Sequence, residues 1–217
     1  MSKATESYEK LGLYISNGDF TFDISNEPTI EDFEKVIGEK TTLVAKCVLN
    51  TEEYFPIKYN KNGKLAKNNR EYFETDDEDY DGKKVDYIEE DSAWVSDDEE
   101  WLYCLAYDRR IVKGGMTETS LKDRYKSYSC GTDRAMKIGN CSTTNFIVTE
   151  CNALAIMNGM KVEIYGIAVP YEVVSKTRFG IKKDCKLSSV RGEETMLTEA
   201  FKTAYGHKPV LCVQEGK

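Results

Sequence analysis

The 217-residue sequence predicts an α+β fold on three observations. Strand and helix patterns follow one another over residues 101–217 in the order β-β-α-α-β-α, as in a small sheet covered by helices. The composition, 40% apolar and 31% charged residues, is that of a globular chain long enough to bury a sizeable core. No apolar run reaches the length that spans a bilayer, and the first ten residues lack the apolar centre of a secretory signal. We therefore expect a cytoplasmic protein that does not bind membranes.

One helix and two strands are predicted near the N-terminus. The segment "PTIEDFEKVIGE" (28–39) places its apolar residues on one helical face, and Thr29 stands where a cap is needed. Residues 41–49 and 54–59 are rich in β-branched and aromatic side chains, which favour strands.

A cationic segment follows at residues 57–73. Its basic residues recur at every third position, a period that forms no helical face and suits an extended segment. Cations among aromatic and asparagine residues are typical of nucleic-acid contacts, and an ordinary solvated loop is the alternative. The residues that we assign to DNA binding here are Lys58, Lys61 and Lys64.

An acidic block interrupts the chain. Residues 71–100 hold 15 acidic and 2 basic residues, too much like charge for a core element. We expect a loop or linker over residues 74–100, which separates an N-terminal accessory region, residues 1–73, from a domain of residues 101–217. A mimic of DNA that inhibits the protein is the alternative. The domain itself holds 18 basic and 12 acidic residues and therefore tolerates a polyanionic partner.

The elements after the acidic block are more regular. Residues 101–107 and 110–113 predict the two strands of a hairpin. Residues 117–131 predict a helix that ends at Gly131, with four side chains on one face. These four residues are Leu121, Arg124, Tyr125 and Tyr128.

Two more helices flank one further strand. Residues 143–159 predict a helix that is capped by Thr143 or Thr144 and that stops at a glycine. Residues 161–170 alternate as a strand does and end at a proline. Residues 193–206 predict the last helix, with a glycine as its stop.

The cysteines and the lone histidine exclude several classes of site. The seven cysteines are odd in number and form no CxxC pair, which argues against a disulfide framework and a zinc knuckle. One histidine, His207, leaves no room for a histidine-rich metal site. We interpret the thiols as reduced, buried and structural.

Four residues with distinctive chemistry occur in a fixed order on these elements. The segment "WLY" (101–103) lies on one strand, and "KGG" (113–115) lies on the next. The helix that contains "LKDR" (121–124) follows. The last helix supplies a glutamate with a leucine three residues on and a proline downstream. In order, the four residues are Tyr103, Lys113, Arg124 and Glu194.

This ordered set resembles the GIY-YIG nucleases, which have a Gly-Ile-Tyr strand, a Tyr-Ile-Gly strand, a helix with an arginine and a later helix with a glutamate. Lysine in place of the second tyrosine, and Tyr128 one turn after Arg124, are similar to the restriction-endonuclease branch of that family. The resemblance covers about residues 100–217. It implies a small antiparallel three-stranded sheet flanked by helices, with the N-terminal residues as an α/β extension.

The resemblance also implies an activity. It points to a metal-dependent endonuclease that hydrolyses phosphodiester bonds of double-stranded DNA, leaves a 5′-phosphate and is site-specific like a restriction enzyme. A symmetric recognition site would then call for a homodimer. The alternatives are a homing or repair-type nuclease, a catalytically inactive nucleic-acid-binding module, favoured by the missing second tyrosine, and an α+β interaction protein.

Each residue of the set has an expected role. Tyr103 takes the proton of the attacking water, and we expect Lys113 and Arg124 to bring its pKa well below the ordinary value of about 10, because cations favour the phenolate. Arg124 also suits a two-point contact with phosphate, and Tyr128 contacts the phosphate or steers the water. The glycines after Lys113 let the backbone or a phosphate approach closely.

The expected cofactor is Mg²⁺, held by the carboxylate of Glu194. Glu199 and Glu150 are the rival ligands, the latter because it interrupts an apolar helix. Asn145, at the start of that helix, is interpreted as a helix cap or as a DNA contact.

Overall fold

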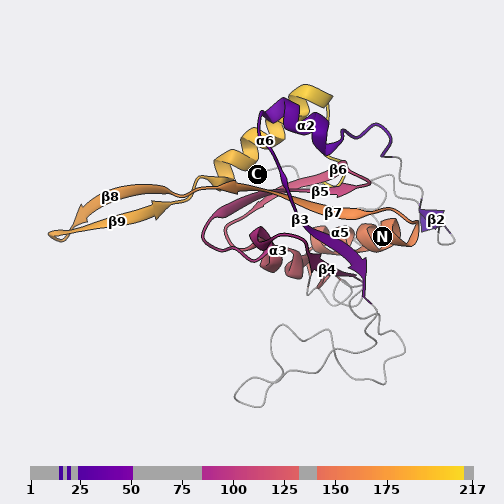
Figure 1. Ribbon diagram of the computed structural model, residues 1–217, viewed down its shortest axis with the longest axis horizontal. Coiled ribbons are helices and arrows are strands. Elements are labelled where there is room, and N and C mark those ends of the chain that lie inside the picture. Colours follow the sequence, from indigo (N-terminus) through magenta and orange to yellow (C-terminus); the bar gives the residue numbers. More distant parts are fainter. Residues whose placement is uncertain (1–14, 17–18, 21–23, 51–84, 132–140, 213–217) are drawn as a thin grey trace, which may run out of the picture.

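A five-stranded antiparallel sheet forms the centre of the protein. The computed structural model describes residues 15–16, 19–20, 24–50, 85–131 and 141–212 (Figure 1). In that part of the chain the sheet has the order β4-β3-β7-β5-β6, so that β6 is one of its edges. The strands are β3 (Thr42–Leu49), β4 (Val85–Glu89), β5 (Glu100–Tyr107), β6 (Arg110–Thr117) and β7 (Val162–Val169).

Helices cover both faces of this sheet. Figure 1 shows α2 and α6 on one side, and α3 and α5 on the other. The alternation of side chains along β5 explains the two layers, because Leu102 and Cys104 pack under α2 and α6, whereas Tyr103 and Leu105 pack against α3 and α5. The helices are α2 (Ile30–Ile37), α3 (Leu121–Tyr128), α5 (Thr143–Met157) and α6 (Val190–Tyr205).

The predicted helices and most predicted strands are confirmed, but the helix predicted over residues 117–131 is shorter, since α3 spans Leu121–Tyr128 and ends before Gly131. Thr29 caps α2, since its Oγ1 accepts a hydrogen bond from the backbone N of Asp32 at 3.2 Å. Gly38 and Gly206 end α2 and α6 with φ of 74° and 81°, a left-handed conformation that glycine adopts without strain. The predicted strand at 110–113 is longer and runs to Thr117. The predicted strand at 54–59 lies outside the described residues.

The predicted cap of α5 was wrong by one or two residues. Ser142, and not Thr143 or Thr144, is the N-cap, and its Oγ accepts a hydrogen bond from the backbone N of Asn145 at 3.1 Å. Both threonines lie inside the first turn, where a hydroxyl cannot reach the free backbone N–H groups in the same way.

The sheet differs from the predicted three strands. Strands β5, β6 and β7 form the expected three, but β3 pairs with β7, and β4 pairs with β3. Strand β3 therefore joins the same sheet as the C-terminal elements, although it comes from the region that was predicted as an accessory part.

The prediction of a loop or linker over residues 74–100 fails for the described part, residues 85–100. Strand β4 lies there, followed by a short 3₁₀ helix, Ser92–Trp94. Two apolar residues of the block, Val85 and Trp94, are buried, while Asp86 and Glu89 are exposed, as are the apolar Ile88 and Val95. A high density of acidic residues therefore does not prevent a strand whose outward face is solvated.

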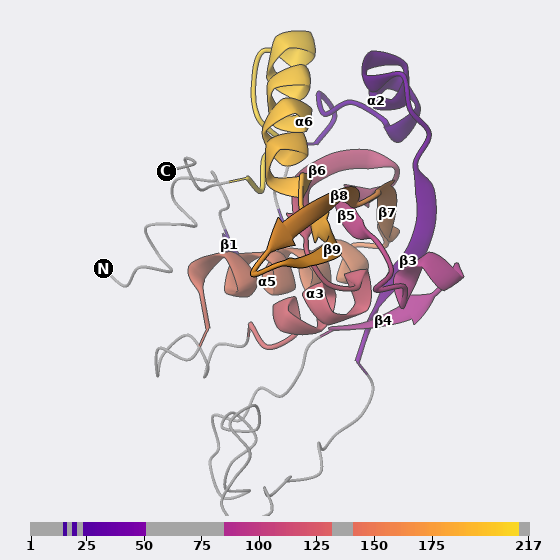
Figure 2. The same ribbon diagram turned by 90° about the vertical axis from the view of Figure 1, so that its left-hand side faces the viewer.

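Two small hairpins lie outside the main sheet. One is formed by β1 (Ile15–Ser16) and β2 (Asp19–Phe20). The other pairs β8 (Glu172–Arg178) with β9 (Ile181–Leu187), which lie between β7 and α6 in the chain. It extends from the body of the molecule in Figure 1 and points toward the viewer in Figure 2. The sequence analysis did not predict this second hairpin.

All seven cysteines lie in the described residues, and none of them forms a disulfide bond. Cys47, Cys104 and Cys151 are buried, as expected of structural thiols. Among the helices that the structure describes, none is both long enough and apolar enough to span a bilayer.

Candidate active site

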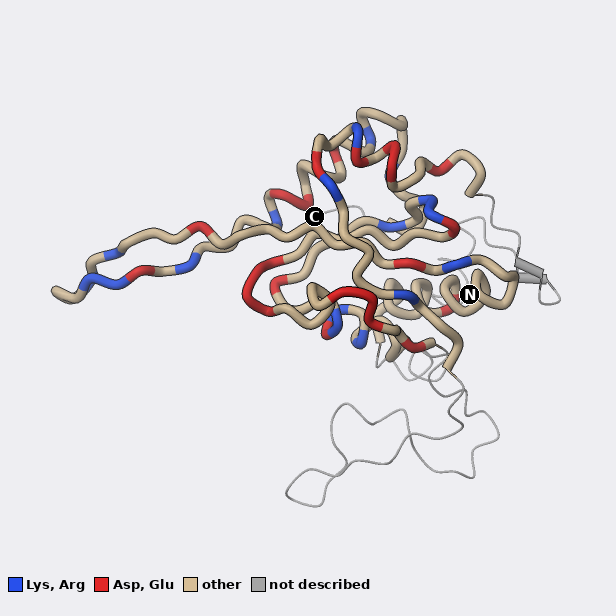
Figure 3. Tube along the Cα trace, viewed as in Figure 1, with Lys and Arg blue, Asp and Glu red and all other residues tan. Residues whose placement is uncertain are grey.

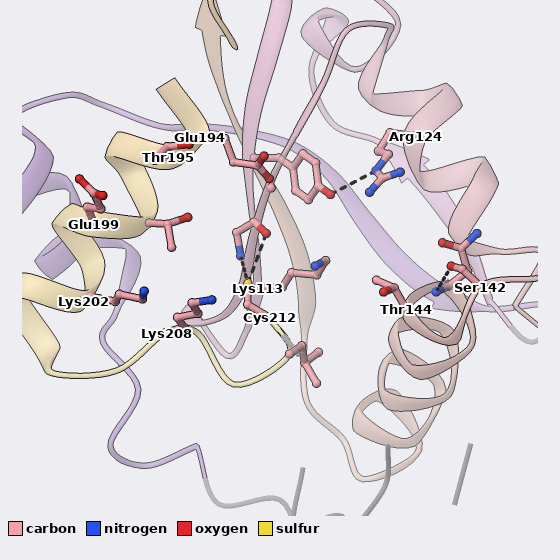
Figure 4. A pocket seen from close by; sticks show the side chains of 16 residues that line it. Lys113, Arg124, Ser142, Thr144, Glu194, Thr195, Glu199, Lys202, Lys208 and Cys212 are labelled. Atoms are coloured by element: carbon pink, nitrogen blue, oxygen red, sulfur yellow. Dashed lines mark hydrogen bonds between the residues drawn. The ribbon is translucent and has the colours of Figure 1, made fainter. Parts of the chain in front are cut away.

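An open pocket of about 890 Å³ lies at the β6 edge of the sheet, where the two helical layers meet. Helix α6 forms one wall, and the start of α5 together with Arg124 of α3 forms the opposite wall (Figure 4). The pocket brings together four of the five residues predicted to be catalytic, namely Tyr103, Lys113, Arg124 and Glu194. The fifth, Tyr128, lies directly behind them.

Two phenols and one guanidinium form a hydrogen-bonded cluster at the pocket. The hydroxyls of Tyr103 and Tyr128 are 2.6 Å apart. Arg124 donates from Nε to the Tyr103 hydroxyl at 3.2 Å and from Nη2 to the Tyr128 hydroxyl at 3.0 Å. The guanidinium thus fixes both phenols with two of its five donors and keeps other N–H groups for an anion in the pocket.

The local sequence explains why these three side chains meet. Arg124 and Tyr128 are four residues apart on α3 and share a face, so that the guanidinium lies 4.7 Å from the centre of the Tyr128 ring. Ser120 caps the helix and sets its first turn, since its Oγ accepts from the backbone N of Asp123. Tyr103 points to this helix because odd-numbered residues of β5 face α3 and α5.

The predicted acidification of Tyr103 is not what the structure shows. Burial of the ring raises the pKa of its phenol well above the ordinary value, and the neighbouring Tyr128 hydroxyl raises it further. Lys113 and Arg124 lower that pKa, as predicted, but by less than burial raises it. The effect of the two charges was predicted and that of desolvation was not, because the burial of a strand residue cannot be inferred from its neighbours along the chain.

The two glycines of "KGG" have different roles. A Cβ at Gly115 would lie 2.5 Å from Cζ of Tyr103, which is closer than real Cβ atoms come to another heavy atom. Gly115 pairs with Tyr103 across the strands, and its missing side chain makes the space for the phenol. A Cβ at Gly114 would meet nothing within 4 Å. The close approach that the sequence predicted is therefore made at residue 115 by the protein's own tyrosine.

Lys113 lies at the inner part of the pocket. It is on β6 opposite Leu105, and only 8% of it is exposed. A lysine that is so buried has lost most of its hydration, and an anion bound in the pocket would compensate for this loss. Two cations that the sequence analysis missed, Lys202 on α6 and Lys208 after it, also line the pocket (Figure 4). Only the tertiary fold brings them there, since they lie 89 and 95 residues after Lys113 in the chain.

Of the three candidate metal ligands, two line the pocket. Glu194 is half-buried and Glu199 is exposed, and both are on α6. Glu150 is buried in α5 and is not among the residues that line the pocket. Within the described residues, no group of three or more histidine, cysteine, aspartate or glutamate side chains is arranged to hold a metal ion.

This set of donors fits Mg²⁺ and does not fit a metal that needs an all-protein site. Mg²⁺ usually keeps several waters and binds through one or two carboxylates together with oxygens of a bound phosphate. Glu194 supplies one carboxylate in an open pocket, and Glu199 offers a second.

The remaining predicted DNA contacts are only partly described. Asn145 lines the pocket, and its Nδ2 donates to the backbone O of Ser127 at 3.0 Å and to the Ser127 Oγ at 3.2 Å. The side chain is therefore held by the end of α3. The lysines predicted to bind DNA, Lys58, Lys61 and Lys64, lie outside the described residues.

The protein is thus an α+β protein with a cationic pocket at a sheet edge, where an arginine holds two buried phenols. Two solved structures are similar to this chain. The restriction endonuclease HPY188I in complex with product DNA is 23% identical, with a TM-score of 0.48, over 89% of this chain and 90% of that chain. A mutant of bacteriophage T4 EndoII is 14% identical, with a TM-score of 0.43, over 81% and 96%. No protein-family model and no curated protein matches the chain.

Proposed function

We propose that the protein is a metal-dependent DNA endonuclease of the GIY-YIG type, which hydrolyses phosphodiester bonds at specific sites. One observation carries this proposal: a guanidinium that binds two phenols faces a pocket with Lys113 at its inner part and Glu194 on the opposite wall. A phenol, several cations and a carboxylate are the groups that phosphodiester hydrolysis requires together.

Each residue has a role in the proposed reaction. Tyr103, once its own proton has passed to the solvent, takes a proton from the attacking water. The water oxygen bonds to phosphorus as the bond to the departing 3′ oxygen breaks. Arg124 and Lys113 stabilise the additional negative charge on the phosphate in the transition state. Tyr128 donates or accepts the hydrogen bond that keeps the Tyr103 hydroxyl in place. Lys202 and Lys208 contact phosphates next to the scissile one.

Glu194 would hold Mg²⁺ in this proposal, with Glu199 as the rival ligand. When bound, the ion would neutralise charge on the phosphate and on the departing oxygen. The partner would be double-stranded DNA, recognised in part by residues 1–73. A symmetric recognition site would require a homodimer, because one chain contains one such pocket among its described residues.

A second candidate function is DNA binding without cleavage. The raised pKa of Tyr103 favours it, since a neutral phenol is a poor proton acceptor.

Incubation of the protein with supercoiled plasmid and Mg²⁺ separates the candidate functions. We expect discrete linear fragments, which disappear when EDTA is added. Random nicking would point to a homing or repair-type nuclease. A plasmid that is retarded on a gel at low salt but stays intact would favour DNA binding without cleavage. A plasmid that is not retarded would overturn the proposal that the protein binds DNA.

The Lys113→Met variant tests how the phenol is activated. The reactive form is the phenolate, and its pKa in the folded protein is raised, so the wild-type rate should increase about tenfold per pH unit below that pKa. Removal of the Lys113 cation raises this pKa further. We therefore expect slower cleavage at every pH and a profile displaced to higher pH, measured as single-turnover rates.

Lys122→Met is the matched control, because it removes the same charge from an exposed position on α3. A pH profile of Lys113→Met that coincides with that of the control would remove Lys113 from the activation of Tyr103.

A further inference from the structure

The hairpin of β8 and β9 is an arm that stands apart from the rest of the protein. Figure 1 shows it extending beyond the end of β7 without a helix or strand beside it, and in Figure 2 it points toward the viewer. Most of its residues are exposed on both faces, with Val174, Cys185 and Leu187 as the partly buried exceptions. A two-stranded hairpin is only marginally stable in water by itself, so an arm of this kind gains from a partner.

The charge of the arm indicates a polyanionic partner. Residues 171–187 contain five basic and two acidic side chains, and basic positions recur along both strands in Figure 3. The register places three basic side chains on one face, with Glu172 at its base, and two basic side chains with Asp184 on the other. Lys176 is directly opposite Lys183, and Arg178 follows on the same face, one pair closer to the tip.

This face, which we call the lysine face, carries like charges where a stable hairpin would carry opposite ones. Two lysines in a direct cross-strand pair repel each other and destabilise the free hairpin. Within the described residues neither Lys176 nor Lys183 forms an ion pair. On the opposite face, Asp184 accepts a hydrogen bond from Ser175 and lies between Lys182 and Lys186 in the register. An anion that binds the lysine face would remove the repulsion.

The residue at the tip of the arm is unfavourable for the backbone conformation of the turn. Phe179 and Gly180 form a two-residue turn with φ of 54° and 74°. Such a turn favours asparagine at its first position, because a bulky side chain is strained at positive φ. Phe179 is nevertheless there, with 88% of its surface exposed and with the Arg178 guanidinium 5.0 Å from the centre of its ring. Folding alone does not require a strained, exposed aromatic residue at this tip, so its presence indicates that Phe179 contacts a partner molecule.

The arm is also connected to the candidate active site. Strand β9 ends at Leu187, and α6 begins at Val190, so Glu194 lies one turn into the helix that follows the arm. The arm is about 20 Å long, because each strand has seven residues that rise about 3.3 Å each. The major groove of DNA is about 12 Å wide and admits a two-stranded β-ribbon.

We propose that this arm enters the major groove of the DNA duplex that the pocket binds, with the lysine face against phosphates and Phe179 against base edges. The proposal rests on the proposed function, since it requires the same duplex at the pocket. An aromatic side chain can contact the methyl group of thymine there, which would add sequence preference to the charge contacts. The arm would therefore contribute both affinity and part of the recognition.

The test is the salt dependence of duplex binding, measured by fluorescence anisotropy with a labelled mixed-sequence duplex in EDTA, which prevents cleavage. The variant K176Q/K183Q removes two charges from the lysine face. We expect the slope of log affinity against log salt to decrease by about 2 and the affinity at low salt to decrease about tenfold or more. The hairpin should remain folded, because a repulsive pair has been removed, and circular dichroism checks this.

The matched control is K182Q/K186Q, which removes two charges from the opposite face of the same arm. We expect a markedly smaller change of slope and affinity. Equal effects of the two double variants would overturn the assignment of the lysine face. The F179N variant suits the turn better than phenylalanine does, and we expect it to weaken binding several-fold without changing the slope. Wild-type affinity of F179N would remove the tip from the proposal.

The outcomes distinguish this proposal from the proposed function. If the wild type binds the duplex and K176Q/K183Q binds it with the same slope, the arm proposal fails and the proposed function stands. If the wild type binds no duplex, both fail. If K176Q/K183Q keeps its DNA affinity but sediments at a lower mass than the wild type, the arm binds a second copy of this chain, which overturns the proposal.

Discussion

Gly115→Ala is expected to reduce cleavage about 100-fold while the protein still folds. The added methyl group would lie 2.5 Å from Cζ of Tyr103, so the phenol must move away from Arg124 and Tyr128. A displacement of about 1 Å at a reacting group can cost about 100-fold in rate. We also expect a loss of about 1–3 kcal/mol in the free energy of unfolding, as for other insertions into packed sites. Single-turnover cleavage and urea denaturation measure the two effects.

Gly114→Ala is the matched control, because it adds the same methyl group to the adjacent residue, where nothing lies within 4 Å. We expect this variant to unfold like the wild type and to cleave at least about tenfold faster than Gly115→Ala. Equal rates for the two variants would mean that the position of the Tyr103 hydroxyl does not limit the reaction.

The elements that the sequence predicts well are those with strong local signals. Helices α2 and α6 have an apolar face and a glycine stop in the left-handed conformation, and both were predicted within a few residues. Strand β4 was missed because its signal is the alternation of a few apolar residues within an acidic block. The arm was missed because both faces of its strands are exposed and polar, so that no alternation with a buried face marks it.

Those residues of the candidate site could be predicted whose order along the chain indicates their role. Tyr103, Lys113 and Arg124 were predicted to converge, and all three line one pocket. The hydrogen bonds of Tyr128 to Tyr103 and Arg124 were not predicted. The protonation of Tyr103 was predicted in the wrong direction, because it depends on burial, which the fold as a whole decides. Lys202 and Lys208 carry no local signal that separates them from ordinary surface lysines, and only the position of α6 brings them to the pocket.

Glu194→Ala is expected to abolish cleavage and to leave DNA binding intact. Glu194 is half-buried in the wall of the pocket, opposite the Arg124 side, whereas Glu199 is exposed one turn further along α6. Loss of the carboxylate removes the protein ligand that Mg²⁺ would need, and we expect cleavage to fall by about 1000-fold or more. Duplex affinity in EDTA should not fall, because an anionic side chain repels phosphate and its removal relieves that repulsion.

Glu199→Ala provides the control for this prediction, as it removes the same charge from the same helix. If Glu199 only contributes to the field around the pocket, its variant should cleave within about tenfold of the wild type and respond to Mg²⁺ concentration in the same way. A Glu194→Ala variant that cleaves like the wild type, together with an inactive Glu199→Ala variant, would show that Glu199 holds the metal. Activity in both variants would place the metal on a carboxylate outside this pocket, and Glu150→Gln would then be the variant to measure.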